Sequence, residues 1–111
     1  MRCQKLFEKG CIGGVEIRNR VAMTAMGNGL ASWDGEVSLE LIRFYEDRAR
    51  GGCGLIFTEF TRMDETSGAC NPNQLCIATR KHIRSTERVR CHGARIFVQL
   101  YHGGRELSLI H

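Results

Sequence analysis

The sequence lacks a long apolar run and an amino-terminal export signal. No stretch of about 18 apolar residues is present, so no segment is predicted to cross a membrane as a helix. The basic residues near the amino terminus are not followed by the apolar stretch that a secretory signal requires. We therefore expect a cytoplasmic protein that has no membrane partner.

The sequence also lacks closely paired cysteines. Its six cysteines are spread along the chain without a CxxC pair, at Cys3, Cys11, Cys53, Cys70, Cys76 and Cys91. A disulfide scaffold is therefore disfavoured, and reduced thiols of minor structural importance are expected. An alternative is a small metal-binding module, whose ligands would be Cys70, Cys76, His82, Cys91 and His92. Their spacing lacks the short pairs of zinc sites, so no metal ligand is predicted.

The net charge of the 111-residue chain is only +4, from 16 basic and 12 acidic residues. Basic residues do gather around one predicted helix, at Arg80, Lys81, Arg84, Arg88, Arg90 and Arg95. A surface that binds nucleic acid would have aromatic side chains between these charges, but there are none between Phe60 and Phe97. A solvated helix face is the better interpretation, and no nucleic-acid partner is expected.

Short apolar stretches separated by glycines predict the first strands. Residues 11–12 and 15–17 flank Gly13 and Gly14, a pattern typical of a β-hairpin. Residues 21–26 are apolar apart from one threonine and are followed by a glycine-rich turn. They predict a strand that is buried on both faces.

The rest of the chain alternates between helical and strand patterns. Ser38 is a plausible N-cap of a helix that ends at Gly51 and Gly52, and Glu46 and Arg50 have the spacing of an ion pair on it. A buried strand is predicted over residues 53–59, a loop over 61–76, a helix over 80–92 and a third strand over 94–100.

Strands that alternate with helices favour a parallel sheet with right-handed crossovers. The fold class is therefore α/β, and the length allows one small domain over residues 1–111. Polar loops with glycines follow the carboxyl end of each predicted strand. In α/β barrels and in open α/β sheets, ligands bind at that edge.

Gln99 is an unusual residue for an otherwise apolar strand. A buried side-chain amide must satisfy two donors and an acceptor, and leaving them unpaired costs about 1–3 kcal/mol. Its partner could be neighbouring backbone or a water molecule. It could also be a ligand that presents an N–H and a C=O side by side, as a flavin or another pyrimidine-like ring does.

Three further polar residues at the predicted strand ends allow two interpretations each. Glu59 could be a general acid or base, although a carboxylate in this position more often binds backbone N–H groups of a loop. His102 could be catalytic, but packing with hydrogen bonds is commoner. Arg105 could be a solvated loop charge or could bind an anion.

Several segments of the sequence occur together in one order. They are NRVAMTAMGNGLA, DGEV, YEDRARGGCGLIFTE, PNQL and HGARIFVQLYHGGR. In this order and spacing they resemble the amino-terminal part of the Old Yellow Enzyme family, the FMN-dependent NADH:flavin oxidoreductases, over residues 6–106. Within the family, the chain is most similar to the branch of 2,4-dienoyl-CoA reductases and bile-acid-inducible oxidoreductases.

The resemblance implies an amino-terminal fragment of a TIM (β/α)8 barrel, made of a hairpin, about three parallel strands and two helices. FMN would bind at the carboxyl ends of the strands. The residues that match the family's cofactor-binding positions are Thr24, Ala25, Met26, Gly27, Phe60 and Gln99. Among these, Gln99 would bind the pyrimidine edge of the flavin. His102 and Arg105 would help to fix the loop over the site, and the hairpin would close the bottom of the barrel.

The resemblance also implies the activity of a complete enzyme. NAD(P)H would reduce the flavin, and the hydride would pass to an activated alkene such as an enone or an enoyl thioester. The family's catalytic and phosphate-binding residues lie beyond residue 111, so no catalytic residue is predicted here. An iron–sulfur cluster would belong to a carboxyl-terminal part. Residues 1–111 would be part of one FMN-binding domain, and the alternative is an inactive truncated remnant.

Some positions depart from the family's pattern. Ala25 stands where proline is common, and Phe60 stands where a small residue is usual. Gly27 replaces a threonine or cysteine that tunes the flavin in many members, so a side chain at position 27 is not expected to tune it. The helix before Gly93 is about one turn shorter than the pattern.

Overall fold

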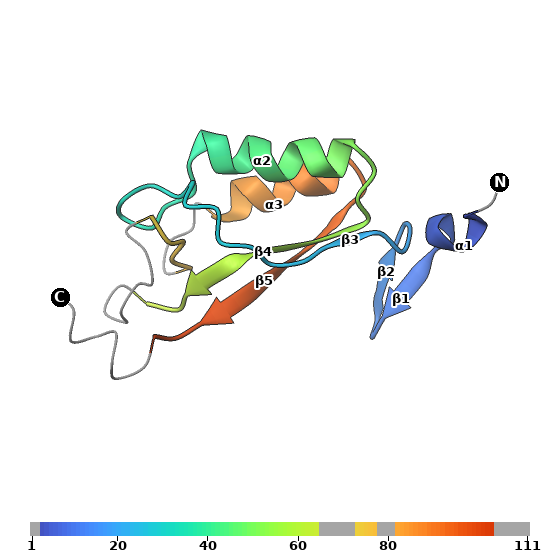
Figure 1. Cartoon of the computed structure of the whole chain (residues 1–111), viewed down its shortest axis with the longest axis horizontal. Coiled ribbons are helices and arrows are strands. Elements are labelled where there is room, and N and C mark those ends of the chain that lie inside the picture. Colours follow the sequence, from blue (N-terminus) through green and yellow to red (C-terminus); the bar gives the residue numbers. More distant parts are fainter. Residues whose placement is uncertain (1–2, 65–72, 78–81, 104–111) are drawn as a thin grey trace.

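The computed structural model describes residues 3–64, 73–77 and 82–103 (Figure 1). The short helix α1 (Gln4–Phe7) precedes an antiparallel hairpin of β1 (Gly10–Ile12) and β2 (Val15–Ile17). A parallel sheet follows, in the order β3 (Ala22–Met23), β4 (Leu55–Arg62) and β5 (Arg95–Tyr101). Its crossovers contain α2 (Leu39–Arg50) and α3 (His82–Cys91).

The molecule has two layers. Figure 1 shows α2 and α3 side by side over one face of the sheet, while no helix of the described residues covers the other face. The hairpin lies beyond the amino-terminal ends of the strands, where Arg95 Nε donates to the Glu16 carbonyl oxygen at 3.0 Å. The predicted α/β class, hairpin and order of three parallel strands with two helices are confirmed.

Helix α2 begins and ends where local sequence requires. The Ser38 hydroxyl accepts a hydrogen bond from Leu41 N at 3.0 Å, which satisfies one of the free N–H groups of the first turn. At the other end Gly52 has a φ of +111°, a conformation that favours glycine. This turn brings Cys53 N to 3.1 Å from the Arg48 carbonyl oxygen and stops the helix.

The hydrophobic core lies between the helices and the sheet. Leu41, Tyr45 and Ala49 recur at helical spacing on α2 and are at most 1% exposed. They pack in one cluster with Ile56 of β4 and Val89 of α3. Burying a side chain such as Leu41 stabilises a fold by roughly 1.5–3 kcal/mol, so this cluster fixes α2 on β4.

The strand limits differ from the predicted ones. Strand β3 comprises two residues instead of six, because residues 24–26 leave the register with β4. Strand β4 continues three residues beyond Glu59, because Phe60 and the residues after it pair with β5. Helix α1 was not predicted, and none of its residues is buried.

The predicted burial of the first and third strands is wrong. In β3, Ala22 is exposed and Met23 is half-buried. In β5, Val98 is 40% and Leu100 is 60% exposed, and Gln99 between them is also exposed. Each of these strands has β4 on one side only within the described residues, and burial on both faces requires neighbours that the local sequence does not supply.

Candidate functional site

Three of the six predicted cofactor-binding residues meet at the carboxyl-terminal end of the parallel sheet. We call residues 24–27, Phe60 and Gln99 the strand-end site. Phe60 and Gln99 are partners in the register of β4 and β5. A Cβ atom added to Gly27 would lie 2.5 Å from Cε1 of Phe60, so the loop after β3 touches the Phe60 ring. The structure therefore brings together Gly27, Phe60 and Gln99, although 72 residues separate the first from the last.

The other three predicted residues are less closely gathered. Thr24 is exposed and Ala25 is half-buried in the segment that leads to Gly27. The Met26 side chain is 54% exposed and lines a different cavity, of about 630 Å³, beside β3 and the end of α2. Residues 25–27 have no backbone hydrogen-bond partner within the described part of the chain, which leaves their amide groups available to a ligand.

A β-bulge decides which side chains face the site. Phe57 pairs with Phe97 and Phe60 pairs with Gln99, so three steps along β4 match two steps along β5. The Phe57 and Phe97 rings touch edge to face at 5.7 Å, which places them on one face. Because of the extra residue, Phe60 lies on the same face as Phe57, and its ring is 5.4 Å from that of Tyr101. Bulges re-aim side chains in this way near functional sites.

The bulge also turns Glu59 toward the helices. The Glu59 side chain is fully buried, and its Oε2 accepts a hydrogen bond from Asn28 N at 3.1 Å. The backbone N–H of Glu59 donates to the Tyr45 hydroxyl at 2.8 Å. The expectation that Glu59 binds loop N–H groups is confirmed. Its carboxyl group lies beneath the loop and not at the open face that a general acid or base would occupy.

Burial dominates the electrostatics of this cluster. Loss of hydration raises the pKa of Glu59 above its usual range, while the backbone N–H groups of Asn28, Gly29 and Leu75 act in the opposite direction. Burial likewise raises the pKa of Tyr45, and the nearby Glu59 carboxyl group adds to that rise. Both groups are therefore more difficult to ionise than they would be in water.

Gln99 does not occupy the environment that its apolar neighbours suggested. Gln99 is exposed on β5, so the expectation that its amide is buried in the strand is wrong. The exposed amide remains accessible to a ligand. His102 is also exposed, and Arg105 lies outside the described residues.

Sequence reasoning missed Asn28 and Tyr45 as parts of the site. Tyr45 was recognised as a core position of a helix, but a buried tyrosine hydroxyl also needs a hydrogen-bond partner, which is a usable indication. Asn28 stands between two glycines, and its side-chain oxygen accepts from Leu30 N at 3.0 Å. Asparagine in such a turn often binds the backbone two residues on.

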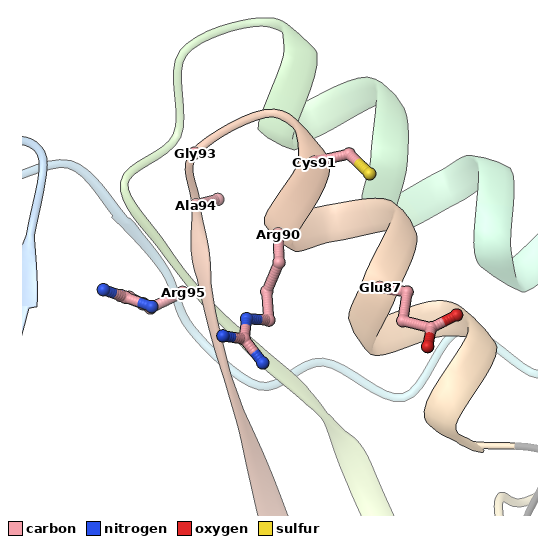
Figure 2. A pocket seen from close by; sticks show the side chains of 6 residues that line it. All are labelled: Glu87, Arg90, Cys91, Gly93, Ala94 and Arg95. Carbon is pink, nitrogen blue, oxygen red and sulfur yellow. The ribbon is translucent and has the colours of Figure 1, made fainter.

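A second cavity lies at the opposite end of the sheet, where α3 leads into β5. It has a volume of about 690 Å³ and is lined by Glu87, Arg90, Cys91, Gly93, Ala94 and Arg95. Figure 2 shows the Cys91 side chain pointing away from the Arg90 and Arg95 guanidinium groups. The thiol and the basic groups therefore do not form a common site.

The remaining expectations concern metal ions, membranes and basic residues. Within residues 3–64, 73–77 and 82–103 no three His, Cys, Asp or Glu side chains gather as a metal site would require. No helix in the same residues has the length and apolar character to cross a membrane. Arg84, Arg88 and Arg90 of α3 are exposed, as expected for a solvated helix face, while Arg80 and Lys81 lie outside the described residues.

Known proteins are similar to this chain in sequence and in the arrangement of strands and helices. The chain is 42% identical over 107 residues to an NADH oxidase of Thermoanaerobacter brockii, a match that covers 93% of this chain and 16% of that protein. It is 36% identical over 114 residues to a cinnamate reductase of Clostridium sporogenes, covering 94% of this chain and 17% of that protein. The chain thus spans about a sixth of the length of these relatives.

Solved structures share the fold. The old yellow enzyme from Trypanosoma cruzi matches with a TM-score of 0.80 and 28% identity, over 95% of this chain and 29% of that one. The described elements are therefore part of a TIM (β/α)8 barrel. A sequence model of the NADH:flavin oxidoreductase / NADH oxidase family matches residues 5–110. The motifs, the fold and this match agree, and the chain belongs to the NADH:flavin oxidoreductase / NADH oxidase family.

Proposed function

We propose that the chain is the amino-terminal part of an FMN-dependent NAD(P)H oxidoreductase of the ene-reductase type. Residues 1–111 would form part of its FMN-binding barrel domain. The observation that carries the proposal is the meeting of Gly27, Phe60 and Gln99 at the carboxyl ends of three parallel strands. In TIM barrels this end of the strands holds the ligand.

The groups at the strand-end site suit a flavin. The Gln99 amide offers donors and an acceptor side by side on an exposed strand face, as the pyrimidine edge of the ring requires. Thr24 adds an exposed hydroxyl, and residues 25–27 add backbone amides without a protein partner among the described residues. The half-buried Phe60 ring supplies apolar surface next to them. This mixture of apolar surface and a few fixed polar groups is typical of cofactor sites.

Each residue would have a limited task. FMN, when bound, supplies hydride transfer from NAD(P)H to the β-carbon of an activated alkene such as an enone or an enoyl thioester. Gln99 would orient the cofactor and polarise its pyrimidine edge through the two-point contact of its amide. Residues 24–27 would line the cofactor from the end of β3. No residue described here would move a proton, and no catalytic residue is assigned to this chain.

The relatives support the reaction class. One is named an NADH oxidase and another a cinnamate reductase, and cinnamate is an alkene conjugated to a carboxylate. A small conjugated alkene is therefore the proposed substrate class. The narrower branch of 2,4-dienoyl-CoA reductases, an iron–sulfur cluster in a carboxyl-terminal part and a cytoplasmic location remain predictions from the sequence.

The main alternative is an inactive remnant, and a flavin titration distinguishes the two. The purified protein is titrated with FMN while flavin fluorescence and visible absorbance are recorded. Saturable quenching at one FMN per chain would support FMN binding. In the full-length protein, anaerobic bleaching with NADH or NADPH and recovery on addition of cinnamate or an enone would support the reaction class. Folded protein that leaves FMN fluorescence unchanged would indicate a remnant, and stoichiometric zinc would favour the metal-binding module.

A further inference from the structure

Glu59 joins three elements of the fold through its buried carboxyl group and its backbone N–H. Its Oε2 accepts from Asn28 N in the loop after β3, and its own backbone N–H donates to Tyr45 of α2. No part of the Glu59 side chain is exposed, and Oε1 has no hydrogen-bond partner among the described residues. Strand β4, helix α2 and the glycine loop (residues 27–29) are thus connected through one residue.

A carboxyl group is not what core stability alone would favour at this position. Burial removes its hydration, and an apolar side chain of similar volume often gives an equally stable or more stable core. The side-chain contact that Glu59 makes is with loop backbone and not with an oppositely charged partner. What the carboxyl group adds is therefore a defined position for that loop.

Among the described residues, few other hydrogen bonds fix the loop near the strand-end site, and one of them is from Asn73 Nδ2 to the Gly29 carbonyl oxygen at 3.5 Å. Residues 25–27 have no backbone hydrogen-bond partner in the described part of the chain. Asn28 is the first residue after them that is held, and Glu59 holds it. Position matters here, because Gly27 lies so close to the Phe60 ring that a Cβ atom would come within 2.5 Å of it.

We infer that Glu59 is a positioning residue, which holds the glycine loop through the Asn28 N–H and thereby sets the shape of the strand-end site. The β-bulge makes this arrangement possible, because it places Glu59 beneath the loop while Phe60, the next residue, faces the open side. For the identity of the ligand, the inference rests on the proposed function. For the position of the loop, it rests on the contacts of Glu59.

Two substitutions at one position separate the hydrogen bond from the charge. Glu59→Leu removes the acceptor at similar volume, whereas Glu59→Gln removes the charge and retains an acceptor oxygen for Asn28 N. Glu46→Gln is the matched control, because Glu46 is a largely buried carboxylate between α2 and α3 that contacts His92 instead of the loop. All variants are made in the full protein, and global stability is measured by urea denaturation.

The first measurement is amide hydrogen exchange without ligand, resolved to the Asn28 amide, because this N–H donates to Glu59 and residues 25–27 have no backbone hydrogen bond to lose among the described residues. Leaving the partly buried Asn28 N–H without an acceptor corresponds to roughly a tenfold or greater change in an opening equilibrium. Glu59→Leu should accelerate exchange there by at least about tenfold more than the fall in its global unfolding free energy accounts for. Glu59→Gln should restore most of the protection, and Glu46→Gln should leave it unchanged. The second measurement is an FMN titration. The Kd for FMN should be highest in Glu59→Leu, lower in Glu59→Gln and unchanged in Glu46→Gln.

The following results would overturn the inference or separate it from the proposed function. Loop exchange that is the same in Glu59→Leu and in the wild type, or that changes only in proportion to global stability, would overturn the inference. So would a Glu59→Gln variant no better protected than Glu59→Leu. If the wild type takes up no FMN while the graded loop effect is present, the proposed function fails and the positioning role stands.

Discussion

The two ends of the parallel sheet differ in what their polar side chains contact. At the amino-terminal end, the Arg18 guanidinium group donates to the carbonyl oxygens of Ala49 and His92, and to that of Cys53 at 2.8 Å. These carbonyls stand at the end of α2, just after α3 and just before β4. One side chain therefore links the backbone at the ends of both helices to the backbone before β4.

Asn19 extends this network. Its Nδ2 donates to the Gly52 carbonyl oxygen at 2.7 Å, and its Oδ1 accepts from Val21 N at 3.1 Å. The packing is close, because a Cβ atom added to Gly54 would lie 2.3 Å from Asn19 Oδ1. At this end Arg18 and Asn19 therefore bind the protein's own backbone.

The carboxyl-terminal end is different. Thr24 and Gln99 are exposed there, and the segment between residue 24 and Asn28 is held mainly by its attachment to Glu59. This difference agrees with a general property of α/β barrels, in which residues at one end of the strands stabilise the fold and residues at the other end bind ligands. Substitutions at the two ends should therefore change different measured quantities.

The largest effect is expected from Arg18→Met at the amino-terminal end. Three hydrogen bonds to backbone carbonyl groups would be lost, although the Ala49 oxygen would still accept from Gly52 N. We expect the free energy of unfolding to fall by about 3 kcal/mol in urea denaturation. Arg18→Lys keeps the charge but not the forked donor geometry, so it should recover only part of this loss. The Kd for FMN of the folded fraction should be unchanged. A higher Kd would contradict the view that the amino-terminal end stabilises the fold without contributing to ligand binding.

Gly27→Ala tests the carboxyl-terminal end. The added methyl group would collide with the tip of the Phe60 ring, and overpacking of this kind costs about 1–2 kcal/mol in stability. FMN binding should weaken as well, because the ring and the loop must separate. Adding Phe60→Ala makes room for the methyl group, so the double variant should lose less than the sum of the two single variants. If the losses of the two single variants add up in the double variant, positions 27 and 60 are not in steric contact.

Gln99→Ala should change binding without changing stability. The amide is exposed, so the urea midpoint should stay within error of the wild type. Loss of its proposed contact with the flavin should raise the Kd for FMN roughly tenfold and should shift the reduction potential of the bound cofactor. The exposed Leu100→Ala serves as the control on the same strand. Unchanged binding and potential in Gln99→Ala would remove Gln99 from the proposed site.

The smallest effects are expected from pH, and they have opposite signs at the two ends. At the amino-terminal end, the hydrogen bond from His92, aided by Arg88 and Arg50, lowers the pKa of Glu46 below its ordinary value of 4.5. The stability that Glu46 contributes is present above that value and is lost as the pH falls through its lower folded pKa.

Glu59 should behave in the reverse manner, because burial raises its folded pKa above 4.5. Ionisation then costs stability, and this cost develops as the pH rises above 4.5 through the folded pKa. Urea midpoints measured from about pH 3 to pH 8 check both signs. Glu46→Gln should remove the loss on the acid side, and Glu59→Gln should remove the decline toward neutral pH. Two profiles with the same sign would contradict this account.

Local features were predicted well because their causes are local. Ser38 caps α2 through its own side chain, and Gly52 ends it through a φ that favours glycine. The interpretation of Glu59 as a partner of loop N–H groups also held, since it needed only a nearby loop. The burial of Gln99 was predicted wrongly, because the burial of a strand depends on neighbours from elsewhere in the chain.

The sequence by itself determined the order of strands and helices, the limits of α2 and the glycine-bearing loops after the strands, because periodicity, capping and turn preferences act over a few residues. Only the tertiary structure decided that β4 bulges between Phe57 and Phe60, which turns Glu59 inward and Phe60 toward Gln99. The physical reason is that a bulge arises from the match between two strands, and that match is a property of their pairing and of neither strand alone.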